Sequence, residues 1–86
     1  MLEKDITINI PENRDARLVA VLVQLASQYE SRVYVELEEK KVNAKSIMGM
    51  MSIGLSQGSK VRLSADGVDE KDAVNNIEKY LIGQEA

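Results

Sequence analysis

A single hydroxyl group, that of Ser46, stands directly before a run of mostly apolar residues, 47–53, in this 86-residue chain. The first backbone N–H groups of a helix lack partners, and a serine oxygen at that position accepts a hydrogen bond from one of them. Phosphorylation of the same hydroxyl would add roughly −1.5 to −2 charges and three acceptor oxygens at the positive end of the helix dipole. Lys41 and Lys45 lie close by in the sequence. The residues therefore leave two interpretations of Ser46 open, a helix cap and a phosphorylation switch.

The run that follows Ser46 carries more large apolar side chains than one side of a two-turn helix can bury. These side chains are Ile47, Met48, Met50, Met51 and Ile53. We expect some of them to face solvent or a partner, and methionine suits such a surface because its flexible thioether adapts to different shapes. The alternative is that the methionines only fill the core.

The composition excludes several other kinds of chemistry. The chain contains no histidine, which removes the commonest general acid or base and the usual nitrogen nucleophile for phosphoryl transfer. It contains no cysteine, so neither disulfides nor thiolate metal sites can form. We expect no metal and no cofactor. A net charge of −3 and only three tyrosines argue against direct binding to nucleic acid or to an anionic membrane.

The chain shows no sign of a membrane segment. No apolar run approaches the roughly 18 residues that indicate a spanning helix, and the first five residues lack the basic and apolar regions of a signal peptide. We therefore expect a soluble, cytoplasmic protein that forms a single domain over residues 1–86.

Hydrophobic periodicity predicts seven elements around Ser46. Residues that alternate in character predict strands, and apolar residues at helical spacing predict helices. The expected order is a strand over 6–10, a helix from Asp15 to about Tyr29, a strand over 33–37, a short strand over 41–43, the helix after Ser46, a strand over 61–65 and a last helix after Asp69.

The helices have clear starts and clear buried faces. Asp15 and Asp69 are the expected N-caps of the first and last helices. The first helix is expected to bury Leu18, Val19, Leu22, Leu25, Ala26 and Tyr29, and the last Ala73, Val74, Ile77, Tyr80 and Leu81.

Short alternating strands favour an antiparallel sheet with one covered face. We predict an α+β fold, an open-faced sandwich of four antiparallel strands covered on one face by three helices in the order βαββαβα. The other face, which is expected to be wet, would carry Thr7, Asn9, Glu36 and Arg62.

With these elements and motifs, the chain resembles the histidine-containing phosphocarrier (HPr) family of the bacterial sugar phosphotransferase system. The likeness covers nearly the whole length and is most specific over residues 42–51, with support from Gly58, the turn 65–67 and the pair Asp69 and Glu70. The family fold agrees with the element order above. The resemblance implies that Ser46 is the target of the ATP-dependent HPr kinase/phosphorylase.

The family's second motif is altered in this chain. In the family it is a glycine, an apolar residue, the phosphorelay histidine, alanine, arginine and proline, whereas residues 13–18 here read Asn, Arg, Asp, Ala, Arg, Leu. Ala16 and Arg17 match, and Asp15 stands in the position of the histidine. Asp15 is interpreted as a helix cap that is not expected to carry phosphate, because aspartyl-phosphate sites generally need a metal held by further acidic residues and Glu12 is the only acidic residue near it. Arg17, which helps to hold phosphate in the family, could pair with Asp15, with a phosphate or with a partner, or could simply face solvent.

A branch of the family, the catabolite-repression HPr-like type, also lacks the histidine and keeps the serine. This resemblance implies a non-enzymatic regulatory protein with no catalytic residue, which binds a transcriptional regulator of the catabolite control protein A type once Ser46 is phosphorylated. The implied contacts are Arg17, Ser46, Ile47, Met48 and Met51. Two alternatives remain open: a phosphocarrier that uses Asp15, and an adaptor that binds phosphotransferase or metabolic proteins without phosphorylation. Exposed edge strands allow a monomer or a strand-swapped dimer.

Overall fold

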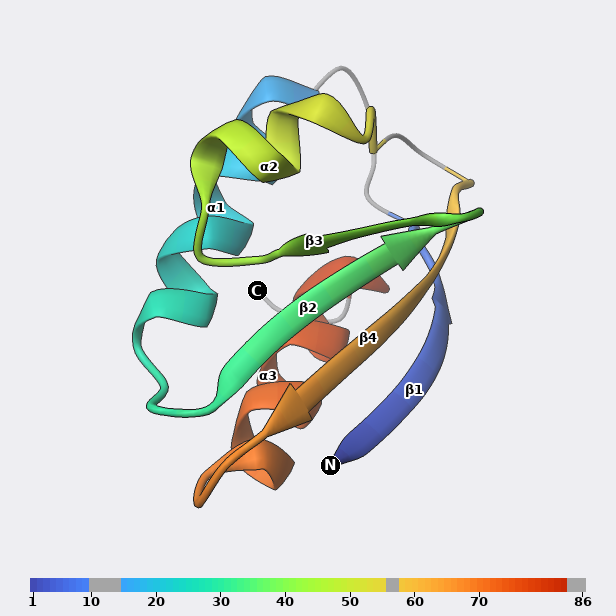
Figure 1. The fold of residues 1–86 in the computed structure, drawn as a ribbon. Helices are drawn as coiled ribbons and strands as arrows, with labels where there is room; N and C mark the ends of the chain where they lie inside the picture. Colours follow the sequence, from blue (N-terminus) through green and yellow to red (C-terminus); the bar gives the residue numbers. More distant parts are fainter. Residues whose placement is uncertain (10–14, 56–57, 84–86) are drawn as a thin grey trace.

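The computed structural model describes residues 1–9, 15–55 and 58–83, and within them the strands and helices follow the predicted order (Figure 1). All neighbouring strands of the sheet are antiparallel, in the order β1-β4-β2-β3. No helix among the described residues is long and apolar enough to cross a membrane. The elements are β1 Leu2–Thr7, α1 Asp15–Ser27, β2 Arg32–Leu37, β3 Lys40–Asn43, α2 Ile47–Ser52, β4 Lys60–Asp66 and α3 Glu70–Leu81.

The core lies between the sheet and the three helices, which confirms the open-faced α+β sandwich. Alternate residues of the strands point toward the helices, and each helix returns an apolar stripe. At roughly 1.5 to 3 kcal/mol for each large side chain, this burial is the main stabilising contribution. The largest buried side chains of the core include Ile8, Leu18, Leu22, Val33, Val35, Met50, Leu63, Val74, Ile77 and Leu81.

Helix α1 is slightly shorter than expected. It ends at Ser27, after which Gln28 and Tyr29 continue in a tighter turn through hydrogen bonds from their amides to the carbonyls of Leu25 and Ala26. Tyr29 and Leu25 are partly buried against the core, and the other predicted residues of this face are buried, so the predicted buried face is confirmed.

The first strand begins earlier in the chain than its apolar pattern predicts. β1 pairs with β4 from Leu2 to Thr7, and Ile10 lies outside the described residues. The expected start at Ile6 was wrong because residues 3–5 are charged, so the first half of the strand lacks the alternation of apolar residues that predicts a strand. Lys4 shares the helix-facing side of the strand, yet it is satisfied there by an ion pair of 2.8 Å with Glu78 of α3.

The uncovered face of the sheet carries a row of alternating charges. In register across the four strands stand Asp5, Arg62, Glu36 and Lys41. Arg62 Nε donates to Asp5 Oδ1 at 3.0 Å, and this hydrogen bond, with the negative charges around it, raises the pKa of Arg62. Thr7 and Arg62 are exposed and Glu36 is half-buried, which agrees with a wet face, whereas Asn9 is exposed but lies beyond the end of β1.

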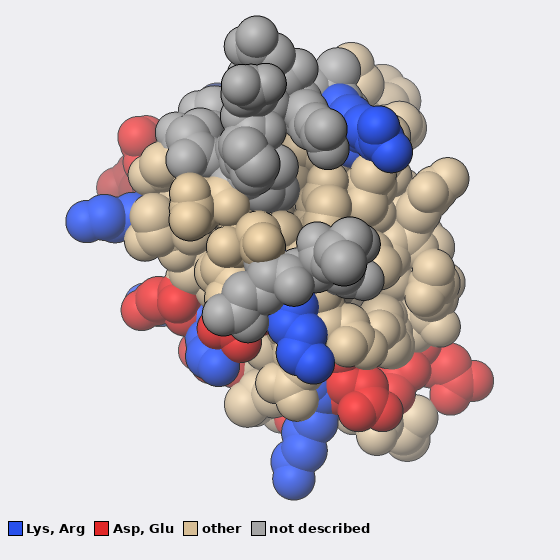
Figure 2. Space-filling model, turned by 180° about the vertical axis from the view of Figure 1, so that it is seen from behind, with Lys and Arg blue, Asp and Glu red and all other residues tan. Residues whose placement is uncertain are grey.

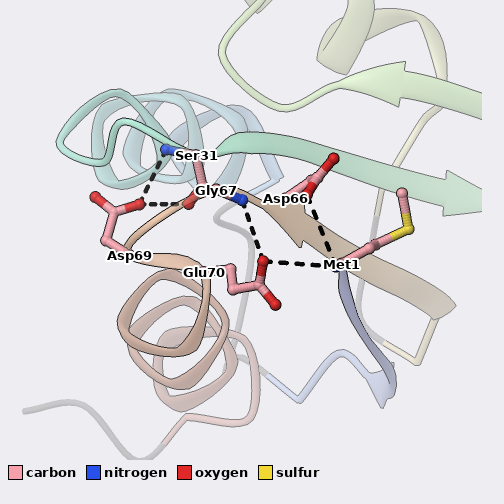
Figure 3. A network of polar contacts seen from close by, with 6 residues as sticks. All are labelled: Met1, Ser31, Asp66, Gly67, Asp69 and Glu70. Atoms are coloured by element: carbon pink, nitrogen blue, oxygen red, sulfur yellow. Dashed lines mark hydrogen bonds and ion pairs between the residues drawn. The ribbon is translucent and has the colours of Figure 1, made fainter.

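Asp69 occupies the N-cap position of α3, but its side chain does not cap the helix. Its carboxylate instead accepts a hydrogen bond from the amide of Glu30 at 2.8 Å. It also accepts hydrogen bonds from the amide of Ser31, at 2.9 Å, and from the Ser31 hydroxyl (Figure 3). These hydrogen bonds lower the pKa of Asp69 below its ordinary value of 3.8. The bond from the Ser31 hydroxyl contributes most, and the bond from the Glu30 amide comes second. The predicted cap was therefore wrong in its chemistry: the residue ties the start of β2 to α3.

The turn between β4 and α3 approaches Ser31 closely enough to require glycine. A Cβ atom on Gly67 would lie 2.6 Å from the Ser31 Oγ and 2.7 Å from its Cα. The Gly67 amide donates to Glu70 Oε1 at 3.1 Å, and the amino group of Met1 lies 3.6 Å from the same oxygen and 3.7 Å from Asp66 Oδ1 (Figure 3). This polar cluster lies at the opposite end of the molecule from α2 (Figure 1).

Candidate functional site

Ser46 is held outside the first turn of α2 by the end of β3. The amide of Ser46 donates to the Asn43 carbonyl at 3.0 Å, and the Lys45 amide donates to Asn43 Oδ1 at 2.8 Å, so the chain turns at Asn43. Ser46 itself is extended, with φ −103° and ψ 114°, and its Oγ accepts the Gly49 amide at 3.2 Å. The predicted N-cap is confirmed, and the half-buried side chain sits where the surface of α2 begins.

Helix α2 divides its apolar side chains between the core and the surface. Met50 has no exposed surface, and Ile53, which follows the helix, is also buried. Ile47, Met48 and Met51 keep 50%, 81% and 67% of their surface exposed. These three residues, called the α2 patch below, confirm that the helix has more apolar residues than it can bury. They are three of the five large hydrophobic residues that are exposed among the described residues.

The helix beside the α2 patch is also poor in charge. α1 packs against α2, and residues 18–29 contain no charged side chain. Seen from behind, the side of the molecule on which α1 lies shows a broad uncharged surface, with acidic residues gathered at its lower edge (Figure 2). A surface of this kind suits a partner that covers the α2 patch and extends over a neutral helix, because few charges on α1 would need to be desolvated.

The two lysines near Ser46 in sequence direct their ammonium groups elsewhere in the unmodified protein. Lys45 Nζ donates to the carbonyl of Tyr29, at the end of α1, at 2.6 Å. Lys41 Nζ lies 5.1 Å from the ring centroid of Tyr34 on the uncovered sheet face, which is a cation–π distance. Both ammonium groups are therefore engaged by tyrosine residues, and Lys45 would have to leave the Tyr29 carbonyl to contact a phosphate on Ser46.

The altered motif lies at the start of α1, which begins at Asp15. The side chain of Asp15 and all of Glu12 lie outside the described residues, so the expected helix cap at Asp15 stays a prediction. Arg17 is exposed in the first turn of α1, at the same end of the molecule as α2 (Figure 1). The structure thus leaves the Arg17 guanidinium accessible from solvent.

Comparison with known proteins agrees with this geometry. Residues 2–82 match the family model described as the PTS HPr component phosphorylation site. The HPr-like protein Crh of Bacillus subtilis (strain 168) is 40% identical over 81 residues, which cover 94% of this chain and 95% of the relative.

Solved structures give the same result. HPr-C-His from Thermoanaerobacter tengcongensis has a TM-score of 0.85 and 45% identity over 100% of both chains. Bacillus subtilis Crh, a catabolite repression protein whose crystal structure revealed a swapping domain in a dimer, has a TM-score of 0.76 and 37% identity over 100% of this chain and 94% of that one.

The fold, a four-stranded antiparallel sheet covered by three helices, is that of HPr and Crh proteins. The match spans almost the entire sequence, and the chain belongs to the HPr family of the bacterial sugar phosphotransferase system, whose members are phosphocarrier or regulatory proteins. The chain nevertheless contains no histidine, the residue after which the family is named.

Proposed function

We propose that the protein is a non-enzymatic, cytoplasmic regulator of carbon catabolite repression, switched by phosphorylation of Ser46 by HPr kinase/phosphorylase. In the phosphorylated state it binds a transcriptional regulator of the catabolite control protein A type. The observation that carries the proposal is the pairing of Ser46 with the exposed α2 patch in a chain that lacks any histidine. The likeness to Crh, a catabolite repression protein, supports the same role.

Phosphorylation is well placed to change recognition without opening the fold. The Gly49 amide already points at Ser46 Oγ, so phosphate oxygens would meet a hydrogen-bond donor and the positive end of the α2 dipole. The net charge would change from −3 to about −4.5 to −5. A partner that places an arginine opposite the phosphate and an apolar groove over the α2 patch would recognise both features together.

Arg17 is the remaining proposed contact. Arg17 is exposed in the first turn of α1, and an exposed guanidinium is able to pair with an acidic residue of the partner. An Arg17→Ala variant should therefore weaken partner binding while leaving Ser46 phosphorylation unchanged. Loss of phosphorylation in this variant would place Arg17 in kinase recognition instead.

The phosphorylation step is tested with HPr kinase and ATP, using intact mass to count phosphates. The wild type should gain one phosphate and Ser46→Ala none. Ser52→Ala is the matched control, because Ser52 is an exposed serine of the same helix whose hydroxyl donates to the Gly49 carbonyl at 2.6 Å. Absence of phosphate on the wild type, or equal incorporation in Ser46→Ala, would refute Ser46 as the switch.

The binding step is tested by calorimetry with a catabolite control protein A type regulator. Phosphorylated wild type should bind at least tenfold more tightly than the unmodified protein, and Met48→Ser with Met51→Ser should lose most of that affinity. Equal affinity of Ser46→Ala and wild type would favour the phosphorylation-independent adaptor. A phosphocarrier that uses Asp15 predicts instead a hydroxylamine-sensitive label from phosphoenolpyruvate and enzyme I, and an unlabelled protein excludes it.

The edge position of β1 supports a proposal about assembly. β1 pairs with one neighbour only, β4, so its release exposes a complete strand-binding edge. We propose that the protein is a monomer that can also form a strand-swapped dimer, as does the related Crh. Size-exclusion chromatography with light scattering should detect both masses after concentration, and a monomer at every concentration would contradict the dimer.

A further inference from the structure

We propose that Met48 and Met51 form an oxidation-sensitive pair that switches the α2 patch off, an inference that rests on the proposed docking role of this patch. Hydrogen peroxide, a two-electron oxidant, transfers one oxygen atom to a thioether sulfur, and each sulfur consumes one peroxide molecule. The O–O bond breaks, an S–O bond forms, water leaves, and the sulfur is oxidised as the peroxide is reduced. The product, methionine sulfoxide, is polar, and methionine sulfoxide reductases reduce it back to methionine.

Exposure within one helix separates the reactive methionines from the protected one. Met48 and Met51 keep 81% and 67% of their surface in solvent, whereas Met50, between them in sequence, is completely buried. Peroxide must reach the sulfur atom, so two of the three sites in α2 are open and the third is closed. Met1 is also exposed, at the start of β1 and away from α2.

The positions of the open pair make the change local and effective. Met48 and Met51 are three residues apart, so they share one face of α2. Two sulfoxides would place two strong acceptors within the apolar α2 patch, and an apolar partner groove shaped for that patch would leave them without donors. Met50 keeps α2 anchored in the core, and oxidation should therefore weaken docking without unfolding the helix.

The chemical half of the proposal is tested by a hydrogen peroxide time course followed by tryptic peptide mass spectrometry. Cleavage after Lys45 and Lys60 puts all three α2 methionines on one peptide, where fragmentation distinguishes them, and Met1 on another. Met48 and Met51 should oxidise at least tenfold faster than Met50. Oxidation of Met50 at the rate of Met48 would overturn the proposal.

The regulatory half is tested on the phosphorylated protein with the catabolite control protein A type regulator as the probe. Peroxide treatment should lower the affinity of the wild type at least tenfold, and sulfoxide reductases A and B should restore it. In the double variant Met48→Leu with Met51→Leu, peroxide treatment should change the affinity for the regulator less than twofold, relative to the same variant before treatment.

The outcomes separate this inference from the proposed function. Unchanged affinity after oxidation of both exposed methionines overturns the inference and leaves the docking role standing. Failure of the untreated, phosphorylated wild type to bind overturns the docking role and the regulatory half together. An equal loss in the double leucine variant assigns the effect to another residue and also overturns the inference.

Discussion

Replacing the single buried methionine of α2 should destabilise the protein far more than replacing either exposed one. Met50 has no exposed surface, and its amide donates to the Ser46 carbonyl at 2.9 Å, so it holds both the core and the first turn of the helix. Met50→Ala leaves a cavity under α2, whereas Met48→Ala and Met51→Ala shorten side chains that are mostly in solvent. The three variants differ in burial but share one chemical change in one six-residue helix.

The expected magnitude follows from that burial. Truncating a buried methionine to alanine costs about 2 to 5 kcal/mol, and a surface substitution changes stability by about 0.5 kcal/mol or less. A domain of 86 residues has a total stability of roughly 4 to 13 kcal/mol, so Met50→Ala should remove a large share of it. With about 4 to 8 °C for each kcal/mol, the melting temperature should fall by at least about 8 °C.

Urea unfolding followed by circular dichroism at 222 nm measures all three variants against the wild type. Equal denaturant slopes would show that the differences reflect stability alone. A loss below about 1 kcal/mol for Met50→Ala would mean that α2 repacks freely or contributes little to the core. A loss above about 1 kcal/mol for Met48→Ala or Met51→Ala would mean that the α2 patch is partly structural, and the separation of docking from packing would fail.

Three other substitutions test the local geometry by the same unfolding measurement. Gly67→Ala should destabilise by about 1 to 3 kcal/mol, since its Cβ would overlap Ser31, and a neutral result would contradict the close approach. The pKa of Asp69 is lower in the folded protein than its ordinary value of 3.8. The Asp69 carboxylate therefore stabilises the fold fully above about pH 3.8, and this stabilisation is lost as the pH falls through the folded-state pKa. The stability gap between wild type and Asp69→Asn should therefore narrow in acid, and a constant gap would argue against the shift. Gly49→Ala should be neutral or stabilise by up to about 1 kcal/mol, because alanine favours a helix and its Cβ meets Ser46 Oγ at an ordinary 3.5 Å; a marked loss would indicate a more crowded cap.

The fold was predictable from local patterns where those patterns were unopposed. The alternation of Val33 and Val35 and the helical spacing of Leu18 and Leu22 each identify a buried face, and the structure buries all four. The same reasoning predicted that some apolar residues of α2 would be exposed, since a short helix cannot bury apolar residues on every side, whereas the choice of Ile47, Met48 and Met51 came from the family resemblance. Local periodicity was thus sufficient for the element order and for the surface helix.

The errors fall where residues distant in sequence meet. Lys4 lies on the helix-facing side of β1, where its half-exposed side chain forms an ion pair with Glu78 of α3, 74 residues later. Asp69 bonds Ser31, 38 residues earlier, in place of its own helix. Neither partnership leaves a signal in the neighbouring sequence, so the periodicity rule placed the start of β1 too late and the capping rule gave the Asp69 side chain the wrong partner.

The face on which Lys41 lies could have been predicted from the register of the β2–β3 hairpin. A two-residue turn at Glu38 and Glu39 sets Glu36 opposite Lys41 in the hairpin, which puts Lys41 on the face of Tyr34 and away from α2. Proximity in sequence was the wrong guide in a strand, because the position within the hairpin register decides which face a side chain occupies.

The arrangement of α2 explains how the proposed switch can act on partners while the fold stays unchanged. Ser46 already satisfies a backbone amide as a hydroxyl, and a phosphoserine would offer that amide further oxygens, so the helix start keeps its bond in both states. Met50 fixes the inward side of the helix independently of Ser46 chemistry. What changes between the states is then confined to the surface, where a new negative charge stands beside the α2 patch. A partner that contacts the charge and the patch at once would therefore favour the phosphorylated state, and this requires the serine to stand directly before the helix that carries the exposed methionines.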